Sequence, residues 1–352
     1  MIVTNKETQH IFAQKSIIDE LQIKYDTDNI IIFEYIPKIR LPAFKWIQDF
    51  NFWLYTSKKI KINNRKIKII INIYWEAPSG FLINKMIGDK KDILVIDCGA
   101  EPVNSNHIAS SWWFGYYHFE KSAKLHFNLR NKHYVCLNRR PRYARVKFVN
   151  MLLTTGLVNK GIVSFLSDKT VLFGYENIEW TNMIDSKYHS LLPLEIDSCN
   201  NDTQHFMSNT MQSAFINVVT ETAYEIQNHG GIPLDYDWNR ILISEKTMKA
   251  IWMKQLPLFI AVFGHVNFLR KKGIDVFDDF INHSYDLIID PNERIVAVFN
   301  ELNRLCNIPL DDIRDFCKKN ILRFESNIHK SLAISKIERE IMTQRVTDFL
   351  NY

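Results

Sequence analysis

Glycine is scarce in this chain, with 11 among 352 residues, and the glycine-containing signatures of several enzyme classes are absent. The sequence has no Gly-x-Gly-x-x-Gly dinucleotide fingerprint, no phosphate loop ending in Gly-Lys-Ser/Thr and no Gly-x-Ser-x-Gly nucleophile turn. These motifs position phosphates or nucleophiles in dehydrogenases, kinases and esterases. Their absence disfavours all three classes.

Clusters of metal ligands are also missing from the sequence. No set of histidines and cysteines has metal-ligand spacing, and no Asp-x-Asp pair stands in a setting that suggests a metal-bound nucleotide sugar. Widely scattered thiols, odd in number, are typical of small buried side chains rather than of disulfides or zinc ligands. The five cysteines are Cys98, Cys136, Cys199, Cys306 and Cys317.

Long apolar runs are lacking as well. None reaches the ~18 to 20 residues that span a bilayer, and the opening MIVTNKETQHIF has no charged-then-apolar signal layout. We therefore expect no membrane span and a cytoplasmic location, which is the host cytoplasm if the chain is viral. Ile, Asn and Lys are abundant while Ala and Gly are few, a bias typical of AT-rich viral or bacterial coding sequences.

What the chain contains is typical of an α/β protein of two domains. Its length exceeds one ordinary core, and 46% apolar with 24% charged residues is the composition of a globular protein. The net charge of +5 permits an anionic partner without requiring one. Helical patterns, such as 146–153 and 311–351, alternate with short apolar runs that suit buried strands. These runs are 30–35, 92–97, 134–137, 163–165, 215–219 and 258–264.

A capping residue and a charged pair follow one of these predicted strands. Ser244 is a natural N-cap, which places Glu245 and Lys246 in a first helical turn, where free N–H groups and the helix dipole favour phosphate. The carboxylate can accept from ribose hydroxyls, and the ammonium can pair with a pyrophosphate. The spacing alone favours a plainer interpretation, a capped and solvated first turn.

Arginines crowd the turn after another predicted strand. Pro141 bars a helix immediately before it, so Arg139 and Arg140 lie on a loop, and Arg145 stands next to the following helix start. Crowded guanidinium groups repel one another unless an anion lies among them, and a diphosphate suits their geometry. A solvated basic turn explains the sequence equally well.

Three segments together resemble the donor signature of the fucosyltransferase-like glycosyltransferases, of the alpha-1,3-fucosyltransferase and exostosin type. They are Val219-Thr220-Glu221-Thr222, Ile243-Ser244-Glu245-Lys246-Thr247 and Gln255-Leu256-Pro257. This family has the GT-B fold, in which two Rossmann-like domains face each other across a cleft. The resemblance implies an acceptor-binding domain over 1–131, a donor-binding domain over 132–330, and a terminal helix over 331–352 that crosses back to the first domain.

The resemblance also implies roles for the charged residues of the second domain. Lys246 and Arg145, with Arg139 and Arg140 as rivals, would bind the pyrophosphate of a GDP- or UDP-linked sugar. Glu245 would hold the ribose, and Glu221 with Thr222 would hold the nucleoside or the sugar. The reaction would be an inverting transfer that needs neither a metal nor a separate cofactor. The loop between Glu221 and Glu245 is long and Leu242 replaces an aromatic residue, which leaves the identity of the donor open.

In the first domain, Gly99-Ala100-Glu101-Pro102 is similar to the family's Gly-Glu-Pro element, with one extra residue. Glu101 is therefore the candidate base on the acceptor hydroxyl, although a turn or helix cap is an equally simple role. The acceptor would be a glycan, or double-stranded DNA with hydroxylated bases as for a phage enzyme.

A basic segment provides the alternative function. Lys and Ile alternate around Asn63-Asn64 from Lys58 to Lys68, which predicts a hairpin with a basic face. Lysines on an edge hairpin often serve only solubility. Together with the arginine loop 139–145, the hairpin 58–68 would instead suit a non-catalytic nucleic-acid-binding protein.

Overall fold

The structure, a computed structural model, describes a little over half of the chain. The described residues are 2–3, 30–35, 68–73, 93–97, 102, 104–109, 127–138, 142–165, 183–192, 194, 208–221, 224 and 241–351. Contacts divide the chain into two compact units. The first comprises Met1–Trp112, Asp235–Arg240 and Ile337–Tyr352, and the second comprises Trp113–Leu234 and Ile241–Lys336.

The first unit contains a sheet of five parallel strands in the order β1-β2-β3-β4-β5. The strands are β1 (Ile2–Val3), β2 (Ile30–Tyr35), β3 (Lys68–Ile73), β4 (Ile93–Asp97) and β5 (His107–Ala109). Four successive residues of β4, Ile93 to Ile96, are buried. Burial on both faces is typical of a strand that lies between two parallel neighbours. It explains why the first four residues of β4 are all apolar.

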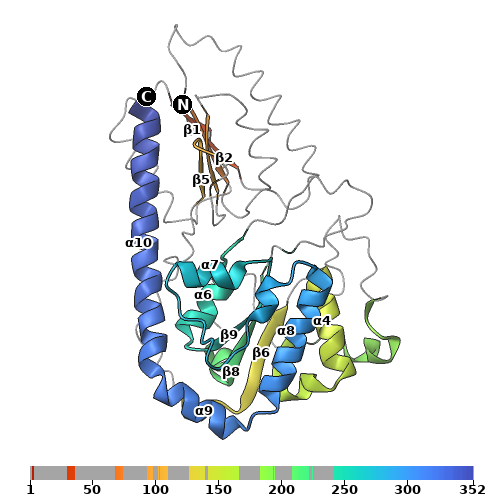
Figure 1. Cartoon of the computed structure of the whole chain (residues 1–352). Helices are drawn as coiled ribbons and strands as arrows, with labels where there is room; N and C mark the ends of the chain where they lie inside the picture. Colours follow the sequence, from red (N-terminus) through yellow and green to blue (C-terminus); the bar gives the residue numbers. More distant parts are fainter. Residues whose placement is uncertain are drawn as a thin grey trace. The chain divides into compact units, whose positions relative to one another are not determined.

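The second unit is built on a four-stranded, all-parallel sheet in the order β7-β6-β8-β9, flanked by helices (Figure 1). Its strands are β6 (Lys132–Asn138), β7 (Gly161–Phe165), β8 (Ala214–Thr220) and β9 (Leu256–Ile260). All seven residues of the central strand β8 are buried. This Rossmann-like arrangement confirms the predicted α/β class for the part of the chain that these strands occupy.

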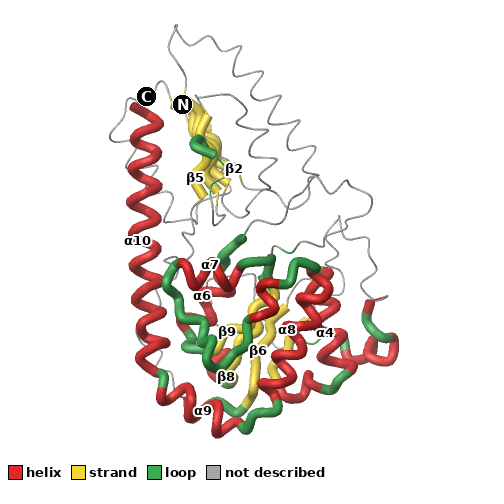
Figure 2. Tube along the Cα trace, in the orientation of Figure 1, coloured by secondary structure: helices red, strands yellow, loops and turns green. Residues whose placement is uncertain are grey.

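Helices cover both faces of this second sheet, as Figure 2 shows by its red coils around the yellow strands. α4 (Tyr143–Thr154) connects β6 to β7, and α6 (Glu245–Trp252) connects β8 to β9. The two crossovers run in opposite directions along the sheet, and because such crossovers are right-handed, they lie on opposite faces. α8 (Pro291–Cys306) shares the face of α4, where the rings of Phe148 and Phe299 meet edge-on at 6.0 Å.

The remaining helices border this core. They are α5 (Ser208–Gln212), α7 (His265–Lys271), α9 (Leu310–Lys319) and α10 (Ile321–Asn351), with short 3-10 turns η3 (Phe127–Leu129), η4 (Leu157–Lys160), η6 (Ser186–Leu191) and η7 (Ser284–Leu287). The division between the units falls at Ile337, so α10 has residues in both of them. Within the first unit, the guanidinium of Arg345 on α10 donates to the carbonyl of Ser105 at 2.6 Å.

Two sequence predictions on this core have a clear outcome. The thiols of Cys136, Cys306 and Cys317 are free and buried, which confirms the prediction for these three cysteines. β9 begins at Leu256, two residues before the predicted strand, and therefore contains Pro257. The missing amide of a proline is tolerated there because β9 lies at the edge of the sheet.

Candidate functional site

The carboxyl ends of β6 and β8 form the point where the chain reverses its direction across the second sheet. β6 is followed by β7 on one side, while β8 and β9 are added on the other. In open parallel sheets, ligands bind outside the carboxyl ends of the strands at such a switch point. This edge is therefore the candidate ligand-binding site of the second unit.

Two polar side chains join the strands at this edge. The register pairs Tyr134 with Ile216, which brings Asn138 and Thr220 side by side four residues later. The Thr220 hydroxyl donates to Asn138 Oδ1 at 2.6 Å, and both residues are buried. This hydrogen bond fixes the ends of β6 and β8 relative to each other without any ligand.

Arg145, in the first turn of α4, reaches the same edge. Arg145 is 6% exposed, and its guanidinium donates to the Thr220 carbonyl at 3.3 Å. Burial raises the pKa of the Cys136 thiol to about 12, while the Asn138 amide and the charge of Arg145 oppose that rise. The predicted residue Arg145 thus places a buried positive charge at the switch point.

Glu221, the residue after β8, holds the start of α6. Its carboxylate accepts from the Ser244 amide at 3.1 Å, from the Ser244 hydroxyl at 2.5 Å and from the Thr247 hydroxyl at 2.7 Å. The side chain of Glu221 is 1% exposed. Ser244 in turn accepts from the Lys246 amide at 3.2 Å, as the predicted N-cap of α6. We call this set of Glu221, Ser244 and Thr247 the α6 cap cluster.

Lys246 and Glu245 lie on the outer side of the α6 cap cluster. The Lys246 ammonium is 3.2 Å from Glu245 Oε1 and 4.0 Å from Glu221 Oε2, and a quarter of its side chain is exposed. Burial alone would raise the pKa of Glu245, but the charges of Lys246 and Lys249 outweigh it, so that pKa lies below its ordinary value. The Glu245 carboxylate is therefore ionised at neutral pH, and the side chains of both residues are partly exposed.

The structure brings five of the predicted site residues to this edge: Arg145, Glu221, Ser244, Glu245 and Lys246. The other four lie outside the described residues, namely Glu101, Arg139, Arg140 and Thr222. The predicted basic hairpin 58–68 also lies outside them, except for its last residue. That residue begins β3, whose two edges are paired with the parallel strands β2 and β4.

Sequence reasoning missed His265, which is the first residue of α7 and follows the short connection from β9. Gly264 precedes it with a φ of +79°, a left-handed conformation that suits glycine. His265 is 1% exposed, and neither ring nitrogen has a hydrogen-bond partner in the described part of the protein. A histidine directly after a glycine at the carboxyl end of a buried strand is the sequence signal that could have identified it.

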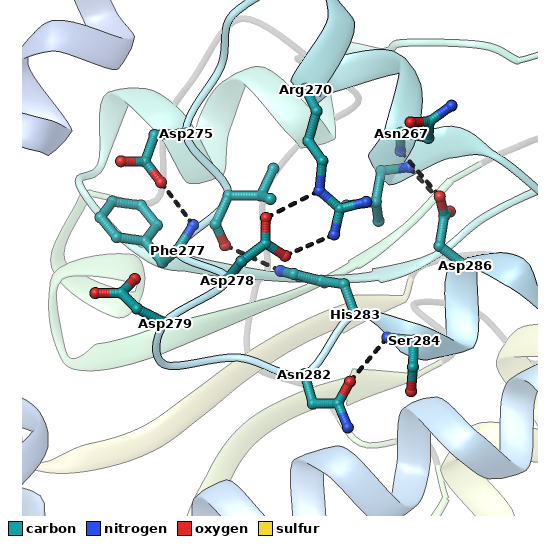
Figure 3. Close-up of polar contacts among 12 residues, drawn as sticks. Asn267, Arg270, Asp275, Phe277, Asp278, Asp279, Asn282, His283, Ser284 and Asp286 are labelled. Atoms are coloured by element: carbon teal, nitrogen blue, oxygen red, sulfur yellow. Dashed lines mark hydrogen bonds and ion pairs between the residues drawn. The ribbon is translucent and has the colours of Figure 1, made fainter.

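A polar pocket of about 340 Å³ lies elsewhere in this unit, beside the loop between α7 and η7. Figure 3 shows that the Arg270 guanidinium, which lines it, is held by two bonds to the Asp278 carboxylate, of 2.9 and 2.6 Å. His283, also in the lining, contacts the Tyr285 hydroxyl through Nδ1 and the Val276 carbonyl through Nε2. The charged and imidazole groups of this pocket have protein partners, whereas the imidazole of His265 at the switch-point edge has none among the described residues.

The described residues contain no metal site and no membrane span. No three His, Cys, Asp or Glu side chains among them converge as a metal site would require. None of their helices combines the length and apolar character of a membrane span. No protein-family model matches the chain, and no curated protein matches it significantly.

Proposed function

We propose that the chain is a glycosyltransferase that binds a nucleoside-diphosphate sugar at the carboxyl edge of its β7-β6-β8-β9 sheet. The observation that carries the proposal is the gathering of Arg145, Lys246 and the capped start of α6 at the switch point of a Rossmann-like sheet. Two cationic side chains and the positive end of a helix suit a diphosphate.

Each residue of the edge has a distinct role in this proposal. Lys246 exchanges part of its pairing with Glu245 for a phosphate oxygen, which frees Glu245 to accept from ribose hydroxyls. Arg145 supplies positive charge from beneath the switch point. Glu221 and Ser244 position the first turn of α6, because the oxygens of Glu221 are already engaged by three donors. Arg139 directly follows Asn138 in the sequence and adds a further cation with Arg140.

The remainder of the proposal rests on the resemblance to the fucosyltransferase-like family. It comprises a GT-B pairing of two Rossmann-like domains, Glu101 as the base on the acceptor hydroxyl, and inversion at the anomeric carbon. Cationic side chains and a helix terminus offset the charge of the leaving diphosphate, as a metal does in other transferases. The acceptor is a glycan or a hydroxylated base in DNA.

Calorimetric titration with a panel of nucleoside diphosphates, GDP and UDP first, tests the donor site. Loss of one hydrogen bond to a charged group is worth about 1.5 to 3 kcal/mol, so Lys246→Ala should weaken binding by about 10- to 150-fold. Lys271→Ala, which removes an exposed lysine at the end of α7, is the matched control and should bind normally.

Two results would contradict the proposal. One is that no nucleoside diphosphate binds the wild-type chain, and the other is that Lys246→Ala binds as well as Lys271→Ala does. Strong, salt-dependent binding of duplex DNA without any nucleotide binding would favour the nucleic-acid-binding alternative instead.

A further inference from the structure

The imidazole of His265 is an anomaly among the buried polar groups of the second unit. Its ring lies 4.9 Å from the ring of Phe259, is closed to solvent, and has no hydrogen bond at either nitrogen among the described residues. Buried polar groups nearly always have partners, because leaving one unpaired costs about 1 to 3 kcal/mol. A hydroxyl-bearing ligand at this carboxyl edge of the sheet would supply the partners that the ring lacks.

Two carboxylates surround His265 without pairing with it. The charges of Glu221 and Asp286 both act on the ring, but Glu221 accepts from Ser244 and Thr247. Asp286 accepts from the amides of Val266 and Asn267, each at 2.9 Å. Burial is the largest influence on His265 and lowers its pKa, so the ring is neutral at neutral pH. A neutral imidazole offers one donor and one acceptor.

The surrounding charges decide which part of a donor fits there. A phosphate accepts hydrogen bonds only and would bring further negative charge beside two carboxylates, which is unfavourable. A sugar ring with adjacent hydroxyls is neutral, and each of its hydroxyls both donates and accepts hydrogen bonds. The chemistry of the site thus favours a hydroxylated sugar ring.

The position of His265 connects it with the proposed donor site. The segment that leads into α6 covers the turn before His265, since Ile241 Cδ1 lies 4.0 Å from where a Cβ on Gly264 would be. His265 directly follows this turn, and the charge of Glu221 in the α6 cap cluster acts on its ring.

We propose that His265 binds a hydroxyl pair of the donor, on either the ribose or the transferred sugar, as a further specificity-determining residue of this site. The inference rests on the proposed function and deepens it. His265 contacts the neutral, hydroxylated part of the donor, while Lys246 contacts its phosphates.

His265→Phe tests this assignment, with His283→Phe as the matched control. Phenylalanine keeps a buried ring of similar size and removes both nitrogens. His283 is equally buried, but both of its nitrogens have protein partners. The wild type and both variants are titrated with the nucleoside diphosphate that binds and with its sugar conjugate, and their unfolding temperatures are measured.

The expected results separate a ligand-binding role from a structural one. His265→Phe should unfold at the same or a higher temperature and yet bind the nucleotide sugar at least tenfold more weakly. His283→Phe should unfold at a lower temperature and bind normally. If His265→Phe weakens both ligands, the ribose is the contact, and if it weakens only the conjugate, the transferred sugar is.

Unchanged affinity of His265→Phe for both ligands would overturn the assignment while leaving the proposed function intact. Failure of the wild type to bind any nucleotide would overturn both. If His265→Phe does not fold, the imidazole nitrogen resonances of His265 in the wild type provide the readout. They should move to hydrogen-bonded values when the nucleotide sugar is added, and resonances that stay in place would contradict the assignment.

Discussion

The carboxylate of Glu221 should be a main determinant of the stability of α6, and Glu221→Ala removes it. The substitution deletes the acceptor of two hydroxyl donors and one backbone amide, all within the buried α6 cap cluster. The two hydroxyls can rotate to other acceptors, but the Ser244 amide cannot, and Ser244 is only 4% exposed. The cluster therefore loses its anchor to β8 as well as its hydrogen bonds.

The magnitude follows from these contacts. A hydrogen bond to a charged group contributes about 1.5 to 3 kcal/mol, and breaking a buried charged network typically costs about 3 to 5 kcal/mol. We expect Glu221→Ala to lower the free energy of unfolding by about 4 kcal/mol. Since 1 kcal/mol shifts the unfolding temperature of a domain of this size by about 2 to 4 °C, the decrease should be about 8 to 16 °C.

The assay combines urea unfolding with hydrogen exchange of the α6 amides. Exchange should accelerate first in Glu245–Trp252, because the helix start loses its cap. Glu221→Gln is the control, since its amide can still accept from the Ser244 amide and donate to the Ser244 hydroxyl, and it should lose about half as much stability. A change for Glu221→Ala within about 0.5 kcal/mol, as for a neutral surface substitution, would refute this reasoning.

Three further predictions concern packing, a buried charge and pH. Gly161→Ala would place a Cβ inside the contact distance of the Tyr134 ring, so chemical unfolding should show a loss of about 2 kcal/mol. An unchanged unfolding midpoint would contradict this. Arg130→Ala removes a fully buried guanidinium that donates to two carbonyls at the end of α6, and a loss of about 3 to 5 kcal/mol is expected in the same assay. Burial lowers the pKa of both His265 and His283 below 6.5 in the folded chain. The unfolded chain then binds more protons, so stability should fall as pH drops below 6.5, by at most about 1.4 kcal/mol per pH unit for each histidine. Equal urea midpoints at pH 7.5 and 5.5 would contradict this.

The strands of the second unit could be predicted from the sequence because they are parallel and buried. The run 215–219 lies inside β8, all of whose residues are buried, so four of its five positions are apolar. The exception is Asn217, whose buried amide donates to Gln255 Oε1 at 2.8 Å. The cap at Ser244 was equally predictable, since a serine before a helical pattern serves as an N-cap in most contexts. Local signals of this kind need no knowledge of distant residues.

Contacts between distant residues could not be predicted in the same way. The sequence suggests that Glu221 contacts a ligand, but the carboxylate meets Ser244, 23 positions away, across a connection whose path no local pattern specifies. The unpaired state of His265 likewise depends on where Glu221 and Asp286 direct their hydrogen bonds. Only the three-dimensional arrangement shows which polar groups have hydrogen-bond partners and which lack them.

Amide hydrogen exchange with and without a saturating nucleoside diphosphate tests the central claim most directly. The account predicts slower exchange at the starts of α4 and α6, around Arg145 and Lys246, with no change in α9. Slower exchange confined to the pocket beside Asp278 and Ser284, or no change anywhere in the chain, would contradict a nucleotide site at the switch point.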